Sequence, residues 1–421
     1  MSIPTFRTAD RCRRALFVTY GASHIAKVAP VVKELERRGV ECLLIALTTG
    51  FRKAKQLGLS PIGYKDFLDL VDDPLGVLKL GETLTGNNTH PEVGAFESAC
   101  YLGINYTEWV GELGTDGAAL RYAQRGRRGF LPTRFMSKVI EALEPGVVAA
   151  TSTPRSEQAA IEAAIQLGIP TLTMVDLFAP PSDPFLMRPR HADKVTVVSE
   201  EVRNNFLAAG LGAEQVVVTG SPDFDGLCSP DCAQQAIKFR QERGWTGLNV
   251  VLWAGIMEKT DSAIPLAWVG TGLGIQVEQK LRQWVAANPA NALIVRYHPS
   301  EYHYFPAQGE QQRVYVSPSG AESIQHLLHA SDVVINQVST VGFEAALLGK
   351  RVLHLGFSDW VKNVDFDLSS LGPSQCVPDL DSLVPILQNP PNPDENIRKM
   401  RVPVGPAAPR VAAQVLALLN R

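Results

Sequence analysis

The chain has 421 residues, of which 45% are hydrophobic and 20% are charged, and its formal net charge is −3. That length favours two domains over a single core, and the composition is typical of an ordinary soluble globular protein. A net charge so close to zero gives no electrostatic reason to expect nucleic acid as the main partner.

The cysteines and the apolar runs bear on the cellular compartment. Six cysteines are scattered through the chain without a signal peptide, which favours free thiols in a reducing cytoplasm. No apolar run approaches the ~20 residues that a membrane span needs, so we expect any membrane contact to be peripheral, on the inner face of the plasma membrane. A basic cluster at Arg121–Arg128 suits phosphate, an anionic glycan or a membrane face, or is simply a solvated surface.

The first part of the chain alternates apolar runs with helical patterns. A run at 15–19 precedes a helical pattern at 25–38, and a second run follows at 40–47. The alternation stops at about 60–145 and resumes over 147–198. Apolar runs that are joined by helices predict a parallel sheet that is buried on both faces.

A second series of such runs follows a Pro- and Asp-containing turn. We place the hinge near 221–232, which predicts an N-terminal domain at 1–222 and a second domain at 223–405. The final helix, 406–421, has one apolar stripe and is expected to pack back on the N-terminal domain. The runs of the second series lie at 249–254, 292–297, 333–335 and 351–355.

Polar residues follow several of these runs. His24 comes after the first run of the chain, and Gly255 and His298 end two runs of the second series. In open α/β sheets ligands bind at the carboxyl ends of the strands. We therefore expect these residues to face a ligand.

The segment 332–355 reads as a buried strand, a sharp turn, a helix and another buried strand. Ser339 and Thr340 lie in the first turn of the helix, where unpaired backbone N–H groups and the helix dipole favour phosphate. Glu344 lies on the same helical face as Thr340, in an apolar environment where a carboxylate needs a partner. Sugar hydroxyls beside a bound phosphate would be such a partner, so the segment predicts a nucleotide site.

Motifs in both halves together resemble the GT-B superfamily of nucleotide-sugar enzymes. Within it the chain resembles both the bacterial glycosyltransferases of surface and capsular polysaccharide and the non-hydrolysing UDP-N-acetylglucosamine 2-epimerases. The resemblance implies an α/β fold with two Rossmann-like parallel-sheet domains that face a central cleft. The segments that carry it are 21–30, 151–160, 218–227, 296–299 and 331–350.

One departure separates the two families. Epimerases carry a His-Val-Glu-Ala-Gly-Leu-Arg segment after the strand that corresponds to 171–175, and this chain lacks it. The resemblance therefore favours a glycosyltransferase, which would move a sugar from a CMP- or UDP-linked donor to a glycan or lipid-linked glycan in bacterial capsule or lipopolysaccharide synthesis. An epimerase-like enzyme and an inactive carbohydrate-binding module of the same fold are the alternatives.

The resemblance also implies roles on the donor side. Glu344 would bind the nucleotide ribose, while Ser339 and Thr340 would bind the phosphates. His298, with Pro299, resembles the His-Pro motif of bacterial sialyltransferases, sugar-acid transferases and glycerol-phosphate polymerases, in which the histidine faces the donor phosphate. Such a histidine can stabilise the charge on the leaving phosphate, or it can merely cap a strand end. Arg296 would reinforce that charge or pair with a carboxylate.

Transfer with inversion also needs a base for the acceptor hydroxyl, whereas retaining chemistry does not. His24 is the best-placed candidate, with an unperturbed pKa of ~6.5 that suits the task. Glu97, Glu112 and Asp116 are the other candidates, and Asp116-Gly117 resembles the acid–Gly motif of sialyltransferases.

A metal site is not expected. No Asp-x-Asp motif lies between strands, and Asp223-Phe-Asp225 sits at the predicted hinge. We therefore expect a nucleotide-sugar co-substrate, with neither a metal ion nor another cofactor.

Overall fold

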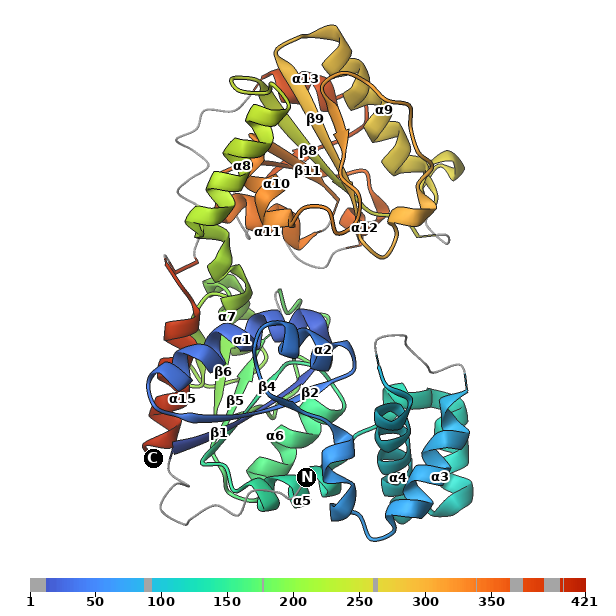
Figure 1. Ribbon diagram of the computed structural model, residues 1–421, viewed down its shortest axis with the longest axis vertical. Helices are drawn as coiled ribbons and strands as arrows, with labels where there is room; N and C mark the ends of the chain where they lie inside the picture. Colours follow the sequence, from blue (N-terminus) through green and yellow to red (C-terminus); the bar gives the residue numbers. More distant parts are fainter. Residues whose placement is uncertain are drawn as a thin grey trace. The chain divides into compact units, whose positions relative to one another are not determined.

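The computed structural model describes residues 13–86, 93–175, 178–259, 264–337, 339–363, 374–389, 402–403 and 405–421. The chain forms two compact units (Figure 1). Unit 1 comprises Met1–Asp225 and Val402–Arg421, and unit 2 comprises Gly226–Arg401. None of the helices in the described ranges is long and apolar enough to cross a membrane.

Unit 1 contains a seven-stranded sheet in the order β3-β2-β1-β4-β5-β6-β7. All neighbouring strands run parallel, and in the central strand Phe17 is in register with Leu44 on one side and Ala149 on the other. The predicted parallel sheet is therefore confirmed. The strands are β1 Arg14–Tyr20, β2 Glu41–Leu47, β3 Pro61–Ile62, β4 Val147–Thr151, β5 Thr171–Met174, β6 Lys194–Val197 and β7 Val216–Val218.

The alternation of side chains along β1 divides the core of unit 1 into two layers. Phe17 packs with α1 and α15, whereas Leu16 and Val18 pack with α5 and α6 on the opposite face. The C-terminal helix α15 thus completes the core of unit 1. The helices around this sheet are α1 Ala22–Arg37, α2 Thr49–Gln56, α5 Thr133–Leu143, α6 Ser156–Gln166, α7 Glu200–Ala208 and α15 Ala408–Leu419.

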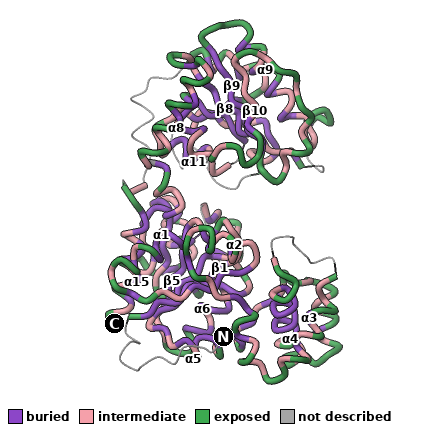
Figure 2. The backbone as a smooth tube through the Cα atoms, viewed as in Figure 1, coloured by how far each residue is buried: buried purple, intermediate pink, exposed green. Residues whose placement is uncertain are grey.

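Between β3 and α5 the chain forms η2 Tyr64–Leu70, α3 Pro74–Thr85, α4 Ala95–Arg125 and η3 Gly126–Gly129. Helices α3 and α4 pack closely because Gly81 and Gly103 lie at their contact. A Cβ on Gly81 would lie 1.9 Å from the carbonyl oxygen of Ala99, and one on Gly103 would lie 2.0 Å from that of Val77. Figure 2 shows buried residues along α4 and more exposed residues along α3.

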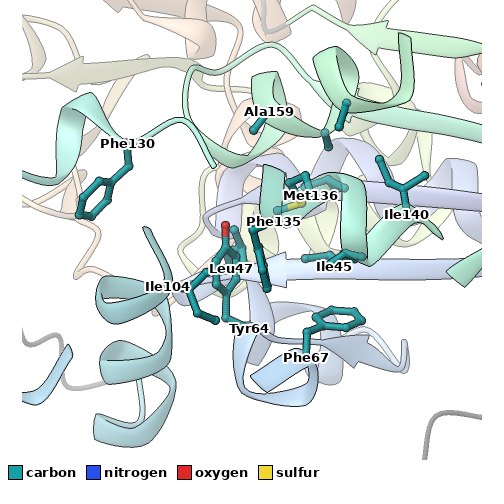
Figure 3. Packing of buried hydrophobic residues seen from close by; sticks show 14 of the residues in the cluster. Ile45, Leu47, Tyr64, Phe67, Ile104, Phe130, Phe135, Met136, Ile140 and Ala159 are labelled. Atoms are coloured by element: carbon teal, nitrogen blue, oxygen red, sulfur yellow. The ribbon is translucent and has the colours of Figure 1, made fainter. Parts of the chain in front are cut away.

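Aromatic side chains fasten this inserted segment to the sheet. Tyr64 from η2 packs against Phe135 of α5 with ring centroids 5.0 Å apart, and Leu47 of β2 belongs to the same buried cluster (Figure 3). The segment at about 60–145, which interrupts the sequence pattern, is therefore part of the unit 1 core.

Unit 2 contains a six-stranded parallel sheet in the order β10-β9-β8-β11-β12-β13. Val251 and Trp253 of β8 are buried against α9 and α13 on one face. The strands are β8 Asn249–Gly255, β9 Asn291–Tyr297, β10 Val314–Val316, β11 Val333–Asn336, β12 Arg351–Leu355 and β13 Ser374–Val377. The helices are η4 Pro222–Cys228, α8 Pro230–Glu242, η5 Leu266–Trp268, α9 Gly272–Ala287, η6 Tyr302–Tyr304, α10 Ile324–Ala330, α11 Thr340–Leu347, α12 Asp359–Lys362 and α13 Leu383–Gln388.

Each sheet has one place where the chain order reverses. In unit 1 the reversal lies between β1 and β4, and in unit 2 it lies between β8 and β11. Ligands of open α/β sheets bind at the carboxyl ends of the strands at such a switch point. The topology therefore marks one candidate site in each unit.

Candidate functional site

The switch point of unit 2 brings together three of the residues predicted from the sequence. Gly255 ends β8, His298 follows β9, and Ser339 follows β11. The backbone N–H of His298 donates to the carbonyl oxygen of Gly255 at 3.0 Å, and β8 pairs directly with both β9 and β11. The three positions therefore lie on neighbouring strand ends.

His298 is exposed and its ring orientation is fixed by Ser300. The backbone N–H of Ser300 donates to Nδ1 at 3.3 Å, and the Ser300 hydroxyl lies 2.8 Å from the same atom. Because Nδ1 accepts an N–H, the neutral ring carries its proton on Nε2. Nδ1 of His298 thus stabilises the turn after β9. Its Nε2–H is available to donate a hydrogen bond to a phosphate oxygen.

Helix α11 begins at the same edge of the sheet. Ser339 is its N-cap and accepts from the backbone N–H of Val341 at 3.2 Å, so its hydroxyl satisfies one of the unpaired amides. The helix can start close to β11 because residue 342 is glycine: a Cβ there would lie 2.5 Å from Nδ2 of Asn336. Thr340 and the remaining amides of the first turn can bind an anion.

Glu344 and Arg296 are both buried, at 7% and 9% exposure. Nη1 of Arg296 contacts Ser317 Oγ at 2.9 Å and also donates to the carbonyl oxygen of Pro318. Ser317 in turn donates to Glu322 at 2.7 Å. Arg296 therefore stabilises the loop that follows β10.

A second buried carboxylate at this edge escaped the sequence analysis. Glu258, at 2% exposure, accepts from Nε2 of Gln337 at 2.9 Å and from the backbone N–H of Asp359 at 3.1 Å. Gln337 also accepts from the backbone N–H of Ile256 at 2.9 Å. These hydrogen bonds connect the loops that follow β8, β11 and β12. In the sequence, the feature that could have indicated this network is the polar Gln337 directly after an apolar strand.

The switch point of unit 1 contains His24 and a carboxylate that the sequence analysis did not single out. Nδ1 of His24 lies 3.1 Å from Oε1 of Glu157 and 2.8 Å from the hydroxyl of Thr151. Thr151 ends β4 and Glu157 is in the first turn of α6, within the segment 151–160 that carries part of the GT-B resemblance. The signal available in the sequence was a glutamate at the start of an alanine-rich segment, the pattern that also singles out Glu344.

Burial dominates the electrostatics of Glu157, which is 0% exposed. Burial raises the pKa of this carboxyl, and the hydrogen bond and positive charge of His24 partly oppose the rise. Oε1 also accepts from the backbone N–H of Tyr20 at 3.0 Å and from Thr151. A carboxylate at Nδ1 orients a histidine so that its lone pair is on Nε2, the arrangement of a general base.

The other predicted bases lie elsewhere in the inserted segment. Glu97 is mostly buried and accepts from the backbone N–H groups of Tyr64 at 2.8 Å and Lys65 at 3.2 Å, and burial raises its pKa. Asp116 and Glu112 are exposed on α4. No hydrogen bond recorded for the described residues links any of these three carboxylates to His24, and their roles as bases stay predictions.

The hinge Asp-x-Asp has a structural use. Asp225 accepts from the backbone N–H groups of Ala407 at 2.6 Å and Ala408 at 2.8 Å, and so caps α15. Asp223 accepts from the hydroxyl of Ser221. Within the described ranges, no group of three or more His, Cys, Asp or Glu side chains is placed to hold a metal ion.

A family model described as CDP-glycerol:poly(glycerophosphate) glycerophosphotransferase matches residues 158–404, more than half of the chain. The chain belongs to this glycerophosphotransferase family. Membership confirms the prediction of a transferase of bacterial cell-surface polysaccharide synthesis, in preference to an epimerase. The matched residues include all the predicted donor-side residues of unit 2. Among curated proteins, no sequence matches the chain significantly.

Solved structures confirm the GT-B fold. A putative UDP-N-acetylglucosamine 2-epimerase from Listeria monocytogenes is similar with a TM-score of 0.61 at 14% identity, over 97% of both chains. The UDP-GlcNAc 2-epimerase from Neisseria meningitidis, solved with bound UDP-GlcNAc, has a TM-score of 0.58 at 14% identity, over 96% of this chain and 100% of that one. The wall teichoic acid polymerase TagF has a TM-score of 0.52 at 10% identity, over 97% and 89%.

At these identities the three structures establish the fold alone. They match the two sides of the resemblance seen in the sequence, epimerase and surface-polymer transferase. In this glycerophosphotransferase family member, the stretch that replaces the epimerase segment includes Asp176 and Leu177, which lie outside the described residues.

Proposed function

We propose that this family member transfers glycerol phosphate, or a closely related phosphorylated polyol, from a CDP-linked donor to the growing end of a cell-surface polymer. The family description supports a CDP-linked donor and a poly(glycerophosphate) product. The observation that carries the proposal is His298, exposed at the end of β9 with Nδ1 bonded to Ser300 and a proton on Nε2.

Unit 2 would bind the nucleotide end of the donor. The amides of the first turn of α11, with Thr340, would hold the diphosphate, and Nε2–H of His298 would donate to a phosphate oxygen. Glu344, on the same helix, would bind the ribose. Gly255 allows the Trp253 ring to pack against the end of β8, because a Cβ at residue 255 would lie 2.8 Å from that ring.

The reaction then follows from the charges on the donor. An acceptor hydroxyl attacks the phosphorus that carries glycerol, the bond from that phosphorus to the bridging oxygen breaks, and CMP leaves with the bonding electrons. His24, oriented by Glu157, would take the hydroxyl proton. His298 would stabilise the charge that develops on CMP, as a preorganised donor does. We propose that these groups suffice without a metal ion or another cofactor.

The same groups would also suit sugar transfer from a CMP- or UDP-linked donor to a capsule or lipopolysaccharide precursor. The acceptor in either case would be lipid-linked, and we place the enzyme at the cytoplasmic face of the plasma membrane. Leu75 and Leu120 support peripheral contact because they are 80% and 61% exposed on α3 and α4, and Leu120 directly precedes the arginines of 121–128.

Activity with defined substrates tests the proposed reaction. The enzyme should release CMP from CDP-glycerol only when a lipid-linked polymer acceptor is present, and glycerol phosphate should appear in the lipid fraction. Donors carrying UDP- or CMP-linked sugars should react more slowly. Rapid change of UDP-N-acetylglucosamine at C2 without acceptor, seen by proton NMR, would instead indicate an epimerase.

Membrane contact is tested separately by co-sedimentation with phosphatidylglycerol vesicles. The double variant Leu75→Glu with Leu120→Glu should bind vesicles less. Ile237→Glu is the control, because Ile237 lies on α8 of unit 2 and its exposure, 58%, is close to that of Leu120. Equal binding by both variants would show that α3 and α4 make no membrane contact.

A further inference from the structure

Unit 1 contains a cavity of about 210 Å³ beside the carboxyl ends of β1 and β2. Tyr20 and Leu47 from the two strands form one wall, and Tyr101 and Leu102 from α4 form the other. Arg127 of η3 also lines it. Pockets for drug-sized ligands have roughly 300–1,000 Å³, so this one suits a single small unit of a larger molecule.

The polar group that points to a ligand is the hydroxyl of Tyr101. This residue is 7% exposed, and its hydroxyl is buried without a hydrogen-bond partner among the described residues. Its ring is held between those of Tyr20, at 6.2 Å, and Tyr64, at 5.3 Å. A buried hydroxyl without a partner costs ~1–3 kcal/mol, which a ligand oxygen would offset.

Two guanidinium groups give this end of the cavity a positive charge. Arg127 lines the cavity, and the guanidinium of Arg155 lies 4.1 Å from the centroid of the Tyr20 ring. Burial raises the pKa of Tyr101, and the positive charges of Arg155 and Arg127 oppose that rise. Glu97 lines the cavity too, but its two oxygens already accept from the amides of Tyr64 and Lys65.

The cavity and the proposed base share one residue, Tyr20, which lines the cavity. The backbone N–H of Tyr20 donates at 3.0 Å to Oε1 of Glu157, the atom that lies 3.1 Å from His24. Tyr20 therefore contacts both the cavity and the His24–Glu157 pair, although neither His24 nor Glu157 itself lines the cavity.

We propose that this cavity binds the terminal phosphorylated polyol unit of the acceptor. Its carbon skeleton would pack on Tyr20, Leu47 and Leu102, and its phosphate would meet Arg127 and the Tyr101 hydroxyl. The inference rests on the proposed function, because it assigns the acceptor of that reaction.

The probe for this site is sn-glycerol 3-phosphate, added to the full-length protein with CDP at saturation so that the nucleotide site is occupied. With carbon-13 labelled leucine methyl groups, the signals of Leu47 and Leu102 should shift on titration, and glycerol without phosphate should shift them far less. Arg127→Gln should weaken binding by about tenfold. The matched control is Arg128→Gln, an adjacent exposed arginine that does not line the cavity.

Tyr101→Phe separates binding from packing. It should weaken the probe by about fivefold and leave the melting temperature unchanged or higher, because the hydroxyl has no hydrogen-bond partner among the described residues. Unchanged probe affinity in Tyr101→Phe and Arg127→Gln, or leucine signals that do not move, would overturn the acceptor site while CDP binding persists. Failure of CDP itself to bind would count against the proposed function instead.

Discussion

The two units share a topology but use their switch points differently. In unit 1 the strand ends surround a buried acid–base pair: Glu157 is 0% exposed and His24 is 8% exposed. In unit 2 the strand ends present donors, namely the exposed His298 and the first turn of α11. A buried carboxylate beside a histidine suits proton transfer, whereas N–H donors suit an anion that is already charged.

This contrast shows that a parallel sheet fixes where a site lies but not what it does. Both sites occupy the carboxyl ends of strands at a reversal of strand order. The chemistry comes from two or three side chains placed after those strands. If the assignment is right, damage to unit 1 should affect turnover, and damage to unit 2 should affect donor binding as well.

The largest expected effect is that of His24→Ala on turnover. Loss of a general base should lower kcat by ~10²–10⁴-fold, while the Kd for CDP stays the same because that ligand meets unit 2. Steady-state rates beside calorimetric titration of CDP check both quantities. Full activity in this variant would move the search for the base to Glu97, Glu112 and Asp116, or indicate a mechanism without one.

His298→Ala should fail differently. Removing a preorganised donor to phosphate should lower kcat by ~10²–10³-fold, and it should also weaken CDP, since the phosphate is present before and during the reaction. His303→Ala is the matched control, an exposed histidine on η6 of the same unit. If His298→Ala binds CDP normally, the His298 ring does not bind the phosphate, and its role is to hold the turn through Ser300.

His191 of unit 1 should contribute to the pH dependence of stability. Burial and the charge of Arg188 lower the pKa of His191 to about 4, and the ring lies 2.7 Å from the carbonyl oxygen of Leu186. In the unfolded chain the histidine takes up its proton near pH 6.5. The contribution of neutral His191 to the free energy of unfolding is therefore fully present above that pH. About 3 kcal/mol of it is lost as the pH falls from 6.5 to about 4.

Urea unfolding across that pH range checks this expectation. His191→Gln should reduce the loss of unfolding free energy on acidification, whatever its effect at neutral pH. His303→Gln, at an exposed site in unit 2, should not alter the slope. Identical slopes for wild type and His191→Gln would mean that other groups cause the dependence.

The smallest expected effect is that of Glu344→Ala on nucleotide affinity. A lost charge-assisted hydrogen bond to the ribose should cost ~1.5–3 kcal/mol of CDP binding, while the fold remains intact. The comparison variant is Glu310→Ala, an exposed glutamate of the same unit. Unfolding of the Glu344 variant, or normal binding of CDP by it, would make this carboxylate structural.

The strand ends that build the site of unit 2 could be predicted because local patterns specify them. Apolar runs indicate β8, β9 and β11, and Ser339 with Thr340 indicates the start of α11. Glu157 could not be predicted in the same way. Its partners Tyr20 and His24 come from a distant part of the chain, and only packing brings them to it.

Partners also changed the meaning of residues that were singled out. The sequence left Arg296 either to reinforce the charge at a phosphate or to pair with a carboxylate, and in the structure its guanidinium hydrogen-bonds Ser317 and Pro318. Asp225 had the spacing of a metal ligand, and the structure shows it capping α15. Residue type and spacing leave such choices open because one charged group can meet a ligand or the chain itself.

The sequence by itself determined the α/β class, the two parallel sheets and the class of transferase, since hydrophobic periodicity and short motifs act within a few residues. Only the tertiary structure decided that His24 has Glu157 as its partner and that Tyr101 has a buried hydroxyl beside a cavity. Those facts depend on side chains from β1, β4, α4 and α6 that approach within a few ångströms. Desolvation at such contacts shifts pKa values and leaves polar groups in need of a partner, and no local pattern encodes it.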